Sequence, residues 1–74
     1  MTVKQMQDRL RENFPEATVE VVDLTGTEDH WEVSVKWPKF EGLSRIEQHQ
    51  AVMKAFQAEL KTGEVHALSI RTAK

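Results

Sequence analysis

The stretch that decides the fold is Trp31-Glu32-Val33-Ser34-Val35-Lys36-Trp37, near the middle of a chain of 74 residues. Apolar and polar side chains alternate along it, and a period of two is typical of a strand with one buried and one solvent-facing side. Pro38 ends the strand, because proline has no amide hydrogen to donate to a neighbour. Residues 30–37 are therefore predicted to form the second strand of the fold.

The chain before this strand predicts a helix and a first strand. Apolar residues near the N-terminus recur at three- and four-residue steps: Val3, Met6, Leu10 and Phe14. This spacing is typical of an amphipathic helix, which Pro15 closes. Residues 19–24 are rich in valine, and residues 25–29 supply turn chemistry. The first and second strands should therefore pair as an antiparallel hairpin.

The chain after Pro38 predicts one long helix and a third strand. Ser44 and Glu47 fit a capping box at the start of the helix, and Gly63 fits its C-terminal end. The apolar stripe of this helix comprises Ile46, His49, Val52, Met53, Phe56 and Leu60. Residues 65–72 alternate again. One face of that strand is expected to carry His66, Leu68 and Ile70.

The order helix-strand-strand-helix-strand fixes the topology of the sheet. The second strand, the long helix and the third strand form a crossover, which is almost always right-handed and leaves its two strands parallel. We therefore expect an α+β fold with a three-stranded mixed sheet and both helices on one face. A chain of 74 residues has material for only one core, so residues 1–74 should form a single domain.

Composition narrows the class of function. The chain has no cysteine, which excludes disulfides and thiolate-only metal sites. The first 37 residues hold four basic and eight acidic residues, and the remainder six and four, for a net charge of −2. No apolar run could cross a membrane and no secretion signal is present, so we expect a cytoplasmic protein. No catalytic constellation appears, and an enzyme is not expected.

The second half of the chain also carries a family resemblance. Its loop, its His49-bearing helix and its last strand read Phe40-Glu41-Gly42-Leu43-Ser44, then His49, then Val65-His66-Ala67-Leu68-Ser69-Ile70. This order resembles the BolA-like family. The resemblance runs roughly from Phe14 to Thr72 and implies a fold similar to the type II KH domain. It also implies an accessory protein that binds a monothiol glutaredoxin and shares a 2Fe-2S cluster with it, in cluster trafficking or iron regulation.

The histidines are the candidates for that chemistry. From the residues alone, His66 is either a half-buried, inert strand-end residue or a metal ligand. The resemblance implies the second, since His66 matches the cluster ligand of the His-Ala-Leu strand. The family takes another ligand from the first hairpin loop, where His30 is the only soft donor. The alternative interpretation of His30 is a surface histidine that flanks a strand and binds no metal. Asp29 would fix the His30 tautomer. His49 is expected to be a buried residue that bridges backbone groups.

A nucleic-acid-binding regulator is the alternative function, because BolA-like proteins resemble KH domains. Its candidate residues are Arg45, Lys54 and Arg71. Weak or no binding is expected, since only Gly42 stands where KH domains have Gly-x-x-Gly and glutamines flank His49 where the family has arginines. A structural interaction module is a third alternative. A homodimer is the other partner arrangement left open.

Overall fold

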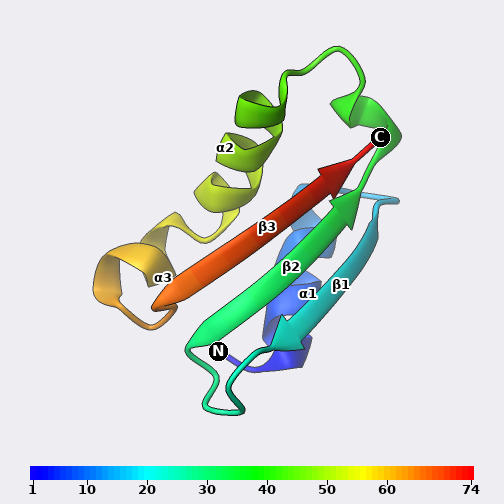
Figure 1. Cartoon of the computed structure of the whole chain (residues 1–74). Coiled ribbons are helices and arrows are strands. Elements are labelled where there is room, and N and C mark those ends of the chain that lie inside the picture. Colours follow the sequence, from blue (N-terminus) through cyan, green and yellow to red (C-terminus); the bar gives the residue numbers. More distant parts are fainter.

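The central strand β2 (His30–Lys36) has the alternation that its sequence predicts. Its inward-facing residues are fully buried: Trp31, Val33 and Val35. In the computed structural model, which describes residues 1–74, β2 pairs antiparallel with β1 (Thr18–Asp23) and parallel with β3 (Ala67–Ala73). The sheet order is β1-β2-β3, so the predicted mixed sheet and its parallel crossover are confirmed (Figure 1).

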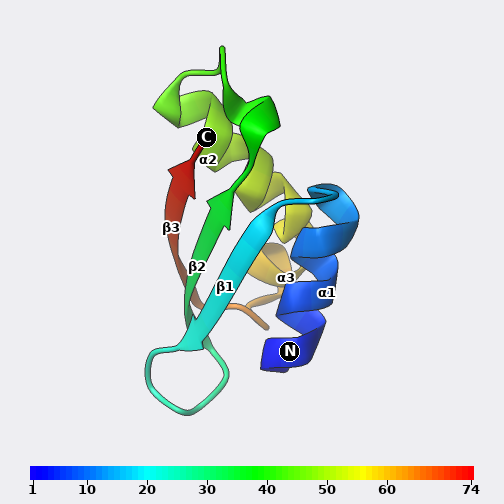
Figure 2. The same cartoon turned by 90° about the vertical axis from the view of Figure 1, so that its right-hand side faces the viewer.

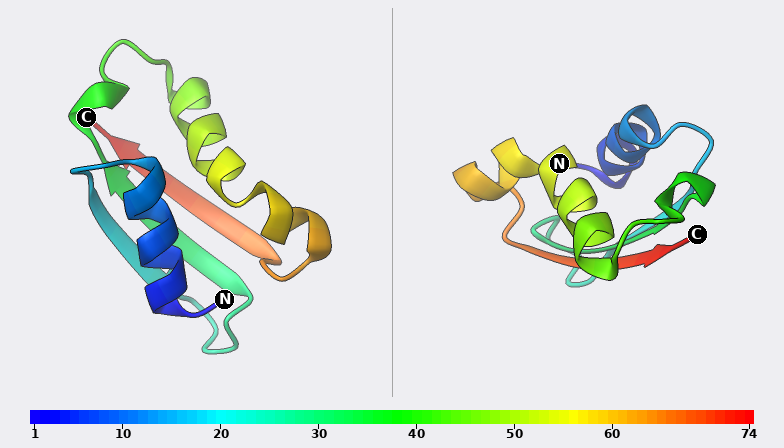
Figure 3. Two further views of the ribbon diagram at one scale, coloured as in Figure 1. Left: turned by 180° about the vertical axis from the view of Figure 1, so that it is seen from behind. Right: turned by 90° about the horizontal axis from the view of Figure 1, so that it is seen from above.

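The helices all lie on one side of this sheet, as expected for both predicted helical segments (Figure 2). They are α1 (Val3–Asn13), α2 (Arg45–Ala55) and α3 (Gln57–Thr62), and a short 3-10 turn, η1 (Pro38–Phe40), follows β2. The opposite face of the sheet carries no helix (Figure 3). Capping boxes start both longer helices. At α2, the Ser44 hydroxyl accepts a hydrogen bond from the Glu47 amide, and the Glu47 carboxylate accepts one from the Ser44 amide, as predicted.

One core lies between the helices and the sheet. Its ten buried residues are Met6, Leu10, Phe14, Trp31, Val33, Val35, Phe40, Val52, Phe56 and Val65. At one edge, Phe14, Trp37 and Phe40 pack edge to face, with ring centroids 5.2 to 5.5 Å apart. The Trp37 indole nitrogen also donates to the carbonyl of Pro15 at 2.8 Å. Trp37 therefore sits at the border of the core and ties the α1–β1 corner to the end of β2.

The prediction of one long helix after Ser44 is wrong. The helix breaks at Phe56, whose φ of −116° and ψ of 20° leave the helical range, so α2 and α3 are separate. Arg9 of α1 reaches into the break, where its Nη1 donates to the free carbonyl of Ala55 at 2.8 Å. The same guanidinium binds both carboxylate oxygens of Glu59 at 2.8 and 3.1 Å. The bend lets the Phe56 ring point into the core, where it is fully buried.

The predicted apolar stripe of this helix is also partly wrong. Ile46 and Met53, seven residues apart on one side of α2, are 68% and 47% exposed. The buried positions are Val52 and Phe56, with Ala51 and Ala55 packed against the core. The stripe is therefore turned away from Ile46 and Met53, because the small alanines let the helix approach the sheet on their side.

Candidate metal centre

The parallel pairing of β2 and β3 brings two of the three histidines to one end of the sheet. His30 is the first residue of β2, and its register partner on β3 is Ala67, the residue after His66. The hairpin loop between β1 and β2 and the turn between α3 and β3 meet there (Figure 1). The centroids of the His30 and His66 rings are 6.0 Å apart. The two residues predicted as metal ligands are thus neighbours in space.

His66 is not the half-buried strand residue that its sequence position predicts. β3 begins at Ala67, and His66 precedes it in an exposed turn, while Val65 takes the buried position. The His66 Nδ1 lies 3.1 Å from the carbonyl oxygen of Gly63. A carbonyl can only accept, so Nδ1 must carry the hydrogen and Nε2 keeps its free lone pair. The ring is exposed and has one nitrogen free to bind a metal.

His30 is held in the same tautomer by a carboxylate. Its Nδ1 lies 2.9 Å from Oδ1 of Asp29, the contact predicted from the sequence. Hydrogen bonds from the Thr27 hydroxyl and then from His30 lower the pKa of the Asp29 carboxyl to about 2. The carboxylate is therefore ionised at neutral pH and can only accept. His30 must donate from Nδ1, and its Nε2 is free.

The donor chemistry of these two imidazoles suits an iron site. Metal-bound histidines almost always donate their other ring N–H to a carboxylate or a carbonyl, and both rings do so here. Two histidines replace two cysteines on one iron in Rieske clusters, so a His pair is an adequate donor set for that metal. The chain has no group of three or more His, Cys, Asp or Glu residues arranged to hold a metal ion. It offers two nitrogen donors but does not enclose a metal.

Comparison with known proteins gives the family. The family described as BolA-like protein matches residues 7–74. The chain belongs to the BolA-like family. It is 35% identical to Protein BOLA2 of Arabidopsis thaliana over 74 residues, which are 99% of this chain and 77% of that one.

Solved structures show the same fold. BolA1 from Arabidopsis thaliana is 27% identical and superposes with a TM-score of 0.85, over 96% of this chain and 88% of that one. The BolA domain of SufE1 from Arabidopsis thaliana is 26% identical, with a TM-score of 0.84 over the same shares. The α+β, BolA-like architecture expected from the sequence is thereby confirmed.

The three basic residues proposed for nucleic acid do not form one patch in this BolA-like chain. Arg45 and Lys54 are nine residues apart on α2, and at about 100° per residue they face opposite sides of the helix. Arg71 on β3 pairs with the Glu32 carboxylate at 3.0 Å. Only Arg45 and Arg71 share a pocket, of about 250 Å³, which His49 also lines. His49 is half-buried there, not fully buried as predicted.

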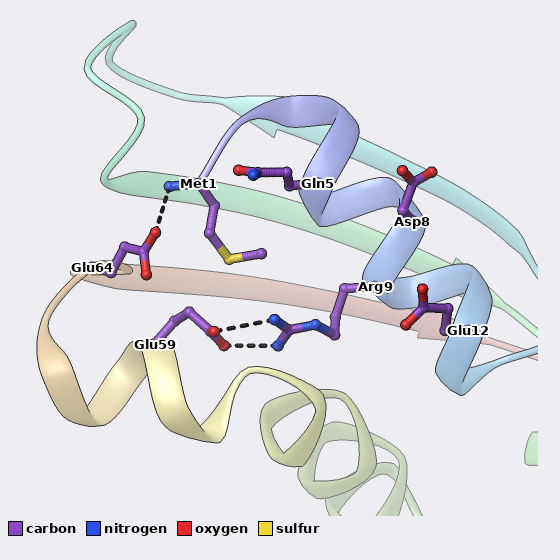
Figure 4. Close-up of a pocket in the computed structure, with 7 residues that line it drawn as sticks. All are labelled: Met1, Gln5, Asp8, Arg9, Glu12, Glu59 and Glu64. Carbon is purple, nitrogen blue, oxygen red and sulfur yellow. Dashed lines mark hydrogen bonds and ion pairs between the residues drawn. The ribbon is translucent and has the colours of Figure 1, made fainter.

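The BolA-like chain also has an acidic pocket of about 420 Å³ between α1 and α3 (Figure 4). Its lining residues are Met1, Gln5, Asp8, Arg9, Glu12, Glu59 and Glu64. Arg9 binds Glu59, and the N-terminal ammonium binds Glu64 at 3.1 Å. The first pair joins α1 to α3, and the second joins the N-terminus to the turn after α3. No helix of this structure has the length and apolar character that spanning a membrane requires.

Sequence reasoning missed several groups at the histidine pair. The carbonyl of Gly63 and the hydroxyl of Thr27 both help to fix the rings. A backbone carbonyl has no residue-type signal, so Gly63 could be found only as a helix end, which its φ of 83° confirms. The Thr25-Gly26-Thr27 run does carry a signal, because threonine hydroxyls next to an aspartate often form local hydrogen bonds.

Proposed function

We propose that this BolA-like protein is a non-enzymatic accessory protein that binds a monothiol glutaredoxin and shares a 2Fe-2S cluster with it. His66 and His30 would supply the two protein ligands from this chain, and the glutaredoxin cysteine and a glutathione thiolate would supply the others. The role is cluster trafficking or iron regulation in the cytoplasm, where glutathione is abundant.

The observation that carries this proposal is the histidine pair itself. Two imidazoles from separate segments lie 6.0 Å apart, and each has its Nδ1 directed at an acceptor. These contacts leave Nε2 of each ring free as a donor, and the carboxylate-histidine-metal units of known metal sites use the same second hydrogen bond. His66 is also exposed, so a partner-bound cluster can reach it.

Each residue of the pair has a defined task. His66 offers Nε2 from an exposed turn, while Gly63 holds its ring. His30 offers Nε2 from the start of β2, while Asp29 fixes its tautomer. The cluster itself supplies electron-transfer chemistry, and nitrogen ligands raise its reduction potential relative to thiolates. With only two donors of its own, the chain can lend ligands to a partner and release them again.

The test is a titration of the protein into a monothiol glutaredoxin that carries a glutathione-ligated 2Fe-2S cluster, followed by visible absorption and circular dichroism. Wild-type protein should change the cluster spectrum, because nitrogen ligands replace thiolates. His66→Ala should abolish the change, and His30→Ala should weaken or alter it. His49→Ala is the matched control, since His49 lines the pocket with Arg45 and Arg71 and has no place in the pair. An unchanged spectrum with wild-type protein would sink the proposal.

Nucleic-acid binding is the second candidate function. The observation that favours it is the pocket that Arg45 and Arg71 share with His49, which could take one phosphate. Arg71 is already paired with Glu32, so the expected contact is weak. Retention of the protein on a DNA column that falls with salt and is lost in Arg45→Ala would support this candidate. Retention that Arg45→Ala leaves unchanged would exclude this pocket as the binding site.

A further inference from the structure

One residue, Asp29, contacts both histidine segments of the candidate site. Its side chain accepts from the His30 ring at 2.9 Å. Its backbone carbonyl accepts from the amides of His66 and Ala67, at 2.8 and 3.2 Å. The residue thus fixes the ring of one histidine and the main chain of the other.

The carboxylate of Asp29 is itself held in place from the hairpin loop. The hydroxyls of Thr25 and Thr27 both donate to its Oδ1. The loop that carries these hydroxyls is closed by Asp23, whose carboxylate accepts from the amides of Gly26 and Glu28, each at 3.0 Å. The orientation of the His30 ring therefore depends on a chain of contacts that begins at the end of β1.

The backbone contact has a different consequence. A carbonyl that accepts two successive amides extends the parallel pairing of β2 and β3 by one step beyond His30. It fixes the point where the chain leaves the turn and enters β3. Because His66 stands at that point, its backbone cannot move away from the hairpin loop while the Asp29 carbonyl holds it.

We propose that Asp29 is the positioning residue of the histidine pair: its carboxylate imposes the Nδ1–H tautomer on His30, and its carbonyl holds the His66 segment beside it. This inference rests on the proposed function for its biological meaning, since a fixed Nε2 matters only if the pair binds a metal. The tautomer itself is a property of the protein alone. It can be measured without any cluster.

The first test is made on the metal-free protein. Long-range proton–nitrogen correlation spectra report which ring nitrogen of each histidine carries the hydrogen. In Asp29→Asn the side chain can turn its NH₂ toward His30 and donate, so the Nδ1–H tautomer is no longer imposed. The spectrum of His30 should then shift toward the Nε2–H form. His66 should not shift, because its acceptor is the Gly63 carbonyl.

Two further variants separate positioning from charge and from folding. Glu28→Gln removes a neighbouring carboxylate that makes no hydrogen bond to either ring, and it should leave both tautomers unchanged. Thr27→Val keeps the Asp29 charge but removes one of the hydroxyls that hold it, and it should shift His30 in the same direction by less. If Asp29→Asn failed to fold, Thr27→Val would still show whether the Asp29 carboxylate sets the His30 tautomer. An unchanged His30 tautomer in both variants would overturn the proposal, as would an equal shift in Glu28→Gln.

The second test uses the cluster-loaded glutaredoxin. Loss of an outer-shell partner usually costs about 10- to 100-fold in metal affinity, so Asp29→Asn should need that much more protein to change the cluster spectrum. Glu28→Gln should titrate like wild type. If wild-type protein leaves the cluster spectrum unchanged but Asp29→Asn shifts the His30 tautomer, the shared cluster is refuted and the positioning of the ring stands. If wild type changes the spectrum and Asp29→Asn matches it in both assays, only the role of Asp29 is refuted.

Discussion

Replacing Arg9 with methionine should destabilise the fold by about 2 kcal/mol, because one guanidinium holds α1 against the break between α2 and α3. Arg9 donates to both carboxylate oxygens of Glu59 and to the Ala55 carbonyl. Its Cζ also lies 5.8 Å from the centroid of the Phe56 ring. Methionine keeps most of the apolar stem of the side chain and removes all of these polar contacts.

The size of this loss in stability follows from how exposed the Arg9–Glu59 ion pair is. Fully exposed ion pairs contribute about 0–1 kcal/mol, whereas removal of one partner of a buried pair costs about 3–5 kcal/mol. The Arg9 and Glu59 side chains are 32% and 14% exposed, between these limits. The Ala55 carbonyl would also lose its donor. A domain of this size has about 3–5 kcal/mol of stability, so a loss of about 2 kcal/mol would lower the melting temperature by roughly 8–16 °C.

Urea unfolding followed by circular dichroism measures this loss. The control is Lys4→Met, which breaks another pair on α1, Lys4 to Asp8 at 3.0 Å, whose side chains are 84% and 48% exposed. That variant should stay within about 0.5 kcal/mol of wild type. If Arg9→Met cost no more than Lys4→Met, the helix break would not depend on Arg9, and the reason given for it here would be wrong.

Three further predictions concern the helix ends and the acid range. The hydrogen bond from Arg9 lowers the pKa of Glu59, so the stability it contributes is present above the unfolded value of about 4.3 and is lost as the pH falls through the lower folded value. The urea midpoints of wild type and Glu59→Gln should therefore differ most near neutral pH and converge in acid; a constant gap would contradict this. Ser44→Ala should cost about 1 kcal/mol in the same assay through loss of the α2 cap, and Ser44→Asp, which can still cap, should lose much less. Gly63→Ala should cost about 1–2 kcal/mol because Gly63 has a φ of 83°, and an unchanged midpoint would show that the turn before His66 relaxes freely.

Much of the fold could be predicted because its signals are local. The alternation from Trp31 to Val35, the proline after Trp37 and the capping box at Ser44 each reflect chemistry within a few residues. The parallel pairing of β2 and β3 then follows from the handedness of crossovers and the length of the chain between them. These rules do not need the tertiary structure.

The helix break could not be predicted in this way. Phe56 continues the apolar stripe, and neither proline nor glycine marks the position. The break is stabilised by Arg9, which lies on another helix far away in the sequence. A contact of this kind leaves no local pattern, so periodicity alone extends the helix through it.

The candidate site likewise has some features that the sequence predicts and others that depend on tertiary contacts. The choice of His66 and His30 came from the family resemblance, and the pairing register shows that the two residues are neighbours. The contacts that orient the His66 ring and hold its backbone are mostly beyond sequence reasoning, because their acceptors are the backbone carbonyls of Gly63 and Asp29. The Asp29 side chain, by contrast, is adjacent to His30 in the sequence, and its contact with the ring was predicted.

The two histidines stand on either side of the longest connection in the fold, the one that contains α2 and α3. A ligand that holds both rings would act as a removable staple across this connection and would bind only the folded chain. At a hundredfold excess over its Kd, such a ligand adds about 2.7 kcal/mol of stability, which is more than half of what a domain of this size has. The loaded and empty forms would then differ in their resistance to proteolysis, and occupancy of the site would set the lifetime of the protein.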